Sequence, residues 1–273
     1  MTLDKNDPAK VFRIKIISMG NSDTGKSCII KRYCEKRFVQ KYLMTIGIDF
    51  GVTKVTVGDR DVKVNIFDFA GHPVFYEVRN EFYRDVQGVM LVYDVTNRAS
   101  FESLDAWIKE MKSELGAKHI AEFDSAYFVV CAYKVDKKQA RVVDELEGRL
   151  WSDARGYPYF ETSALNGDGV SEMFKCLFDG VVEAVISGKK PQPIPVQLGY
   201  NTEQIEAIKK LKSGRDNYER LGVAQNCTKE DINKAYRRLA VLLHPDKSVA
   251  PGSEEAFKIL VNARNQLLLN VKQ

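Results

Sequence analysis

Short apolar runs alternate with helix-like segments along the first two thirds of the chain. FRIKIISMG, GVMLVYDV and AYFVVCAY are rich in β-branched and aromatic residues, and a segment with helical apolar spacing follows each of them. This alternation predicts right-handed βαβ units and a central, mainly parallel sheet. A further run, FGVTKVTVG, faces DVKVNIF across the turn residues Gly58 and Asp59, so we expect a hairpin that adds one antiparallel edge strand.

The pattern changes at SGKKPQPIPVQLGY. Three of the chain's eight prolines stand there, and such a composition favours an extended, semi-rigid spacer. All segments beyond it have helical spacing. The predicted organisation is a flexible N-terminus (1–11), an α/β domain with a mostly parallel six-stranded sheet (12–186), a proline-containing linker with a lead-in helix (187–214) and a small all-α domain (215–273).

The composition is that of a soluble globular protein, with 44% hydrophobic and 29% charged residues. No apolar run approaches the ~18–20 residues of a membrane helix, and the start, MTLDKNDPAKVF, has no signal-peptide core. Five scattered cysteines fit reduced thiols better than a disulfide framework or a zinc site. We therefore expect a soluble protein of the cytoplasm or nucleus.

The net charge of +4 lies entirely in the last quarter of the chain. Residues 1–200 hold 28 basic and 28 acidic side chains, whereas residues 201–273 hold 13 and 9. A basic face can attract nucleic acid, an anionic membrane or an acidic protein partner. An ordinary solvated helix surface is the alternative.

The segment between the first predicted strand and the first predicted helix matches GxxxxGK[ST]. Its glycines allow backbone N–H groups to surround phosphate oxygens, its lysine can contact the outer phosphates, and the next hydroxyl can hold Mg²⁺. The helix that begins here adds the positive end of its dipole. The alternative is a strand–helix turn that binds nothing. The predicted phosphate-binding residues are Gly20, Asn21, Ser22, Asp23, Thr24, Gly25, Lys26 and Ser27.

Further motifs narrow the class of P-loop protein. TIGIDF (45–50) comes before the predicted hairpin, DFAGH (68–72) ends the next long strand, and LVYDVTNRASFESLDAW and ETSA follow later. On these motifs, residues 12–186 resemble a Rab-type small GTPase. The resemblance implies a signalling switch that binds GTP or GDP with Mg²⁺, hydrolyses GTP, and binds an effector protein through its switch regions in the GTP form.

The resemblance also implies roles for individual residues. Ser27 and Thr45 would ligate Mg²⁺, and Asp68 would act on it through a water. Gly71 would sense the γ-phosphate, so the loops around Thr45 and Gly71 would be the nucleotide-dependent switches. Phe38 stands where the family places an aromatic ring on the guanine face; core filling is the alternative. The other residues of the implied nucleotide site are Phe69, Ala70, His72, Tyr133, Lys134, Val135, Asp136, Ser163 and Ala164.

The segment CAYKVD departs from the family's Asn-Lys-x-Asp in one position. By resemblance, Lys134 lies along the base, Asp136 accepts from the guanine ring N–H and exocyclic amine, and Ser163-Ala164 offers an N–H to the guanine oxygen. The family's asparagine amide also bonds the base and ties this loop to the phosphate loop, but Tyr133 has no amide. Unsatisfied partners cost about 1–3 kcal/mol, or about ten- to a hundred-fold in affinity. We expect guanine preference to persist with weaker binding.

A second departure is His72-Pro73, where the family usually has a glutamine that orients the attacking water. An imidazole is shorter and presents its donor and acceptor differently, and Pro73 stiffens the loop. With His72 in the catalytic position, we expect slow GTP hydrolysis and a long-lived GTP-bound state. The alternative is a surface histidine with no role.

The helical C-terminal segment carries a second signature. His244-Pro245-Asp246 ends the helix TKEDINKAYRRLAVLLH, with NYERLGV before it and AFKILVNA after it. Together these resemble a DnaJ-type J domain over residues 215–273. The resemblance implies a co-chaperone in which a helical hairpin presents this tripeptide and stimulates a heat-shock chaperone ATPase. The chain as a whole therefore resembles the Rab-and-DnaJ-domain proteins.

The predicted chaperone-docking face combines the tripeptide with basic residues of the preceding helix. Lys234, Arg237 and Arg238 lie within about one turn of each other and suit an acidic surface on the ATPase. Nucleic-acid binding is disfavoured, because no aromatic interleaving and no base-reading residues support it. We expect Leu239, Leu242, Leu243 and Tyr236 to form core, packed on Tyr218 and Leu221.

Two functions remain open from the sequence. The first is a GTP/GDP switch with a J domain. The second is a nucleotide-poor adaptor whose only biochemical output is co-chaperone activity, which Tyr133 and His72 favour and the intact phosphate loop opposes. Because the sequence ends LLLNVKQ and has no N-terminal myristoylation glycine, we expect no direct lipid anchor and membrane residence only through partners.

Overall fold

The chain divides into two compact units, Met1–Pro193 and Ile194–Gln273. Each has its own hydrophobic core. Among the residues that the structure describes, no helix is both long and apolar enough to span a bilayer. This computed structural model describes residues 12–38, 44–188, 202–244, 248, 250 and 252–270.

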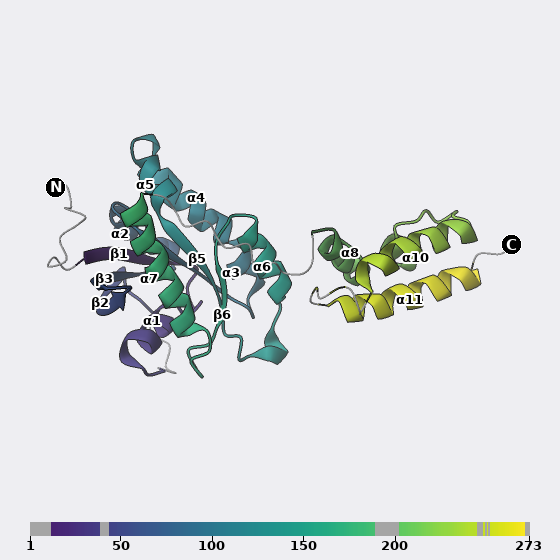
Figure 1. Ribbon diagram of the computed structural model, residues 1–273, viewed down its shortest axis with the longest axis horizontal. Helices are drawn as coiled ribbons and strands as arrows, with labels where there is room; N and C mark the ends of the chain where they lie inside the picture. The colour runs from purple at the N-terminus through teal and green to yellow at the C-terminus, as the bar shows by residue number, and fades with distance from the viewer. Residues whose placement is uncertain are drawn as a thin grey trace. The chain divides into compact units, whose positions relative to one another are not determined.

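A six-stranded sheet forms the centre of the first unit (Figure 1). Its order is β2-β3-β1-β4-β5-β6, in which β2 and β3 pair antiparallel and the other neighbours pair parallel. This confirms the predicted mostly parallel sheet and the antiparallel hairpin at its edge. The strands are β1 Phe12–Met19, β2 Ile48–Val57, β3 Arg60–Phe69, β4 Gly88–Asp94, β5 Tyr127–Tyr133 and β6 Tyr159–Thr162.

Helices cover both faces of this sheet. On one face, Ile29 of α1 and Phe174 of α7 pack with alternate strand residues such as Ile16. On the other, Met111 of α4 packs with the intervening residues such as Ile17. The helices are α1 Lys26–Glu35, α2 Tyr76–Arg79, α3 Arg98–Glu102, α4 Leu104–Leu115, α5 Ile120–Ser125, α6 Glu145–Asp153 and α7 Val170–Ser187.

Two neighbouring interior strands, β4 and β5, are buried along their whole length. This explains why their sequences, GVMLVYD and YFVVCAY, are continuous apolar runs rather than alternating ones. By contrast, burial alternates along the segment VTKVTV of the edge strand β2, between exposed and half-buried residues. Because β1, β4 and β5 are parallel, the carboxyl ends of β1 and β5 lie at the same end of the sheet. Proteins of the α/β class commonly bind ligands at the carboxyl ends of their strands.

The second unit is all-helical: α8 Thr202–Ser213, α9 Asn217–Leu221, α10 Lys229–Leu243 and α11 Ser253–Asn270. The helix α10 begins with a capping box in which Thr228 and Asp231 satisfy each other's backbone N–H groups. The predicted core is confirmed. Leu239, Leu243 and Leu221 are buried, and Tyr236, Leu242 and Tyr218 pack against them while partly exposed.

Candidate functional site

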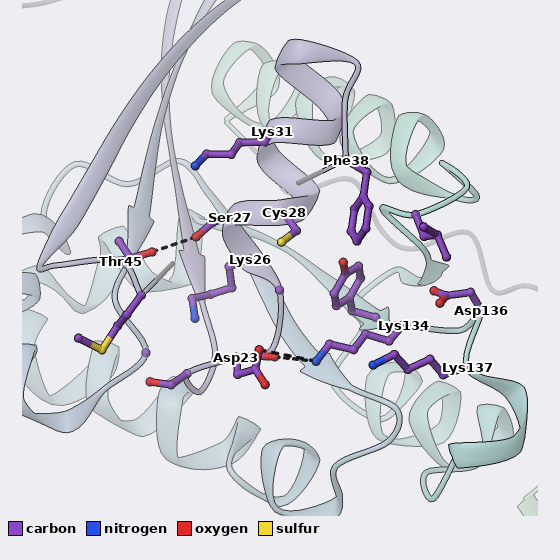
Figure 2. Close-up of a pocket in the computed structure, with 16 residues that line it drawn as sticks. Asp23, Lys26, Ser27, Cys28, Lys31, Phe38, Thr45, Lys134, Asp136 and Lys137 are labelled. Carbon is purple, nitrogen blue, oxygen red and sulfur yellow. Dashed lines mark hydrogen bonds and ion pairs between the residues drawn. The ribbon is translucent and has the colours of Figure 1, made fainter. Parts of the chain in front are cut away.

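A cavity of about 480 Å³ opens at the carboxyl ends of β1 and β5 (Figure 2). Its volume is in the range of ordinary small-molecule sites. The phosphate-loop segment, the segment around Thr45, Gly71 and the loop after β5 all contribute to it, although they are far apart in sequence. The lining residues are Ser22, Asp23, Gly25, Lys26, Ser27, Cys28, Lys31, Phe38, Met44, Thr45, Gly71, Tyr133, Lys134, Asp136, Lys137 and Leu165.

The phosphate-loop segment connects β1 to α1 through a chain reversal. Gly20 and Gly25 have φ of 145° and 85°, and Asp23 is also left-handed with φ of 60°. The Nζ of Lys26 donates to the carbonyls of Gly20 and Asn21 at 2.8 and 2.9 Å. Burial lowers the pKa of Lys26 to about 8. A lysine held this way is ready to pair with an anion, and a bound phosphate would favour its charged form.

Three oxygen-bearing side chains meet beside this lysine. The hydroxyls of Ser27 and Thr45 lie 2.9 Å apart, and Ser27 Oγ also donates to Asp68. The other carboxylate oxygen of Asp68 accepts from Ser18 Oγ at 2.6 Å, and burial raises the pKa of Asp68. Hydroxyl and carboxylate oxygens are the hard ligands that Mg²⁺ prefers, and Mg²⁺ usually completes its shell with phosphate and water. The donor set therefore fits a magnesium nucleotide.

Gly71 lies directly against the phosphate-loop segment. A Cβ on Gly71 would lie 2.3 Å from Asn21 C and Ser22 N and 2.5 Å from Gly20 O, closer than real contacts permit. Only glycine fits where these backbones approach each other. The residue predicted to sense a terminal phosphate is thus adjacent to the loop predicted to bind it.

The predicted base loop after β5 is connected to the phosphate-loop segment by Lys134. This residue has a left-handed backbone with φ of 66°, and its Nζ donates to Asp23 O at 2.9 Å and pairs with Asp94 at 2.7 Å. Asp136 Oδ1 accepts from Ser163 Oγ at 2.6 Å, and Asp136 also lines the cavity. The carboxylate is therefore held in one orientation beside the space for a base.

Tyr133 packs against the phosphate-loop segment with its ring. The side chain is only 4% exposed, and a Cβ on Gly25 would lie 1.9 Å from Tyr133 Cε1. The hydroxyl interacts with Cys28, and burial raises the pKa of Tyr133. The sequence suggested that the loop after β5 lacks a contact with the phosphate-loop segment. The structure instead shows the aromatic ring of Tyr133 in van der Waals contact with Gly25 of that segment.

His72 lies outside the cavity wall. Its Nδ1 accepts from the backbone N–H of Val74 at 3.2 Å, so the ring caps the short 3₁₀ turn Pro73–Phe75. Its carbonyl accepts from Arg79 at 3.0 Å. The ring is exposed and engaged locally, and its catalytic role stays a prediction.

The remaining predicted residues differ in their distance from the cavity. Phe38 both lines the cavity and packs on the hydrophobic core, and its contact with a base stays a prediction. Nine others do not line the cavity and are buried or half-buried: Gly20, Asn21, Thr24, Asp68, Phe69, Ala70, Val135, Ser163 and Ala164.

Sequence reasoning missed five lining residues: Cys28, Lys31, Met44, Lys137 and Leu165. Each lies within a few residues of a recognised motif. Proximity to a motif was thus the available signal, but helical and loop geometry decides which neighbours face the cavity.

The predicted chaperone-docking face is described in part. Lys234, Arg237 and Arg238 are all exposed on α10, and His244 directly follows that helix with its ring 5.9 Å from the ring of Phe257. Within the described residues, none of the three basic side chains makes an ion pair. The other predicted docking residues, Pro245 and Asp246, lie outside the described residues.

The cavity at the phosphate-loop segment, on a sheet with one antiparallel edge strand, is typical of P-loop proteins of the GTPase class. Similarity to known proteins supports the same class. The chain belongs to the Ras family, whose model matches residues 15–183, and the DnaJ domain model matches residues 216–273. It is similar to DnaJ homolog subfamily C member 27 of Gallus gallus (58% identical) and of Homo sapiens (56%), over 98% of this chain and 97% of each relative. DnaJ homolog subfamily C member 27-B of Xenopus laevis is 57% identical over 98% of both chains.

Proposed function

We propose that the chain is a Rab-like guanine-nucleotide switch with slow GTP hydrolysis, whose J domain recruits and stimulates a heat-shock chaperone ATPase. The observation that supports the nucleotide site is the convergence of Lys26, Ser27, Thr45 and Asp68 at one end of a cavity that has Asp136 in its wall. One end suits a magnesium-bound polyphosphate, and the other suits the guanine N–H and amine. When bound, Mg²⁺ would neutralise phosphate charge.

The direct test is the nucleotide content of the purified full-length protein. Acid release followed by chromatography should yield close to one guanine nucleotide per chain, or the protein should take up GDP and GTP when they are added with Mg²⁺. An empty protein that neither nucleotide can fill or stabilise would contradict the switch and leave the adaptor. The engagement of the Tyr133 ring and of the His72 ring in local packing is the observation that favours this second candidate.

The Tyr133→Asn variant should bind GDP and GTP more tightly while its first unit becomes less stable. The amide should restore a contact to the base, a gain of about ten- to a hundred-fold. Removal of a buried ring that packs on Gly25 leaves a cavity, so the free energy of unfolding should fall by about 3 kcal/mol. Calorimetric titration and urea unfolding measure the two effects.

The matched control for that variant is Tyr133→Phe. It keeps the ring on Gly25 and loses only the hydroxyl near Cys28. It should change neither affinity nor stability by much. Equal affinities in the asparagine variant and the wild type would contradict the assignment of this loop to the base.

An effector surface is proposed on the switch regions. Ile46, Phe50, Val74 and Val78 are large apolar residues in or next to the segments around Thr45 and Gly71, and their exposed fractions range from 45% to 78%. Exposed apolar side chains gathered in this way are typical of protein-binding surfaces. Because Gly71 touches the phosphate-loop segment, a γ-phosphate there would alter the position of this surface.

The His244→Gln variant should stimulate a heat-shock ATPase at least about ten-fold less than wild type, because the docking face would lose its imidazole. Single-turnover ATP hydrolysis by the chaperone, with the full-length protein added, measures this. The second unit should keep its helical content, and the affinity of the protein for GTP should be unaltered. Unchanged stimulation would contradict the docking role of the tripeptide.

A further inference from the structure

The helix α8 lies outside the matched DnaJ domain and is nevertheless part of its core. The domain match begins at residue 216, whereas α8 spans Thr202–Ser213. Ile205, Ile208 and Leu211 repeat at helical spacing and are 3%, 3% and 0% exposed. Ile208 and Leu211 belong to the same hydrophobic cluster as α10 and α11. The helix between the proline-containing segment and the J domain is therefore fixed to the J domain.

One end of α8 contacts the last turn of α10. Gln204 Nε2 donates to the carbonyl of Leu242 at 3.0 Å. The last carbonyls of a helix have no partner within the helix, and a glycine cap or a basic side chain often compensates. Here α10 has neither, because it is followed directly by His244 in an extended conformation and has no basic residue in its last turn. Gln204 therefore caps α10 from a different helix.

The other half of α8 contacts the beginning of α11. Gly252 has a left-handed φ of 83°, and a Cβ there would lie 3.0 Å from Lys212 Nζ and 3.6 Å from Ile208 Cγ2. Lys212 also pairs with Glu255 in the first turn of α11, at 2.7 Å. The connection between α10 and α11 carries His244-Pro245-Asp246. Thus α8 contacts both the end of the helix before this connection and the start of the helix after it.

We propose that α8 is a brace that positions the tripeptide for the chaperone, with Gln204 as its positioning residue. This inference rests on the proposed J-domain function. The brace fixes where α10 ends and where α11 begins, so it sets the direction in which the chain leaves Leu243. A J domain without α8 would keep the tripeptide but would not hold it in one orientation. Docking to the chaperone would then carry an additional entropic cost.

The test is the Gln204→Glu variant in the full-length protein. Glutamate has the same shape as glutamine but no donor at neutral pH, and it places a negative charge at the negative end of α10. The concentration needed for half-maximal stimulation of the chaperone ATPase should rise about ten-fold. Gln204→Lys restores a donor and suits the helix end, so it should stay within about three-fold of wild type. The matched control, Glu206→Gln, alters an exposed residue of the same helix and should have no effect.

Amide hydrogen exchange gives a readout that does not depend on any chaperone. The N–H of Ser248 donates to the carbonyl of His244, the first residue of the tripeptide, at 2.8 Å. Its exchange should become about ten-fold faster in Gln204→Glu, while amides in the middle of α10 should not change. If Gln204→Glu matches the Glu206→Gln control in exchange, the brace is refuted. If wild type fails to stimulate any heat-shock ATPase, the proposed function fails, and exchange at Ser248 still decides whether the brace exists.

Discussion

Replacement of Arg79 by methionine should lower the free energy of unfolding of the first unit by about 3–5 kcal/mol. The Arg79 side chain is 4% exposed and forms a bidentate pair with Glu110, with N–O distances of 2.7 and 2.9 Å. Methionine fills much of the same volume, but among the described residues it leaves the Glu110 carboxylate with Tyr83 alone as a hydrogen-bond partner. A partly buried, unpaired carboxylate is the source of the loss.

The control is a second bidentate arginine–glutamate pair in the same unit. Arg98 and Glu147 have the same distances of 2.7 and 2.9 Å, but their side chains are 43% and 28% exposed. Solvent screens such a pair, so Arg98→Met should cost no more than about 1 kcal/mol. Both tryptophans lie in the first unit, so urea unfolding followed by tryptophan fluorescence reports on that unit alone. Equal losses in the two variants would refute the argument from burial.

The Arg79→Met substitution should also loosen the backbone of the proposed switch around Gly71. Arg79 Nη1 donates to the carbonyl of His72 at 3.0 Å and lies 3.4 Å from the carbonyl of Ala70, so it holds the backbone on both sides of Gly71. Its guanidinium lies 4.7 Å from the ring of Trp107, and Trp107 Nε1 donates to Asn21 in the phosphate-loop segment. In Arg79→Met, hydrogen exchange around Gly71 should therefore be faster than in Arg98→Met.

The sequence predicted those features that depend on local pattern. The hairpin of β2 and β3 follows from alternation and a turn at Gly58, and the core of α10 follows from helical spacing. The phosphate-loop segment is recognisable because its chemistry is contained in eight consecutive residues. In each case, residues near one another in the chain determine the result.

Features that depend on distant contacts could not be predicted in this way. Tyr133 looked like a lost amide, because only the fold brings its ring onto Gly25. Arg79 looked like an ordinary charged residue, because its partner Glu110 is 31 positions away and on another helix. The contact of Gln204 with the end of α10 spans 38 positions. Buried polar pairing is set by tertiary structure, and sequence periodicity contains little information about it.

The Lys26→Met variant should lose affinity for GDP and GTP by about ten- to a hundred-fold. A charged donor to a phosphate contributes about 1.5–3 kcal/mol, and the phosphate-loop segment would retain its backbone N–H groups, the Ser27 hydroxyl and the helix dipole. Stability without nucleotide should change little. Two carbonyls, those of Gly20 and Asn21, lose a donor, but a buried charge whose pKa is already lowered to about 8 is removed at the same time.

The matched control is Lys31→Met, which removes another lysine of α1 that lines the same cavity. Within the described residues, Lys31 makes no hydrogen bond to the carbonyls of Gly20 and Asn21, so this variant should remain within about three-fold of wild type. Calorimetric titration of both variants with GDP and Mg²⁺ separates a specific phosphate contact from general attraction by positive charge. If the two variants lose affinity equally, the cavity attracts anions only through its net charge. Lys26 is then not the phosphate ligand that the fold suggests, because a ligand held at one position must matter more than a neighbour of equal charge.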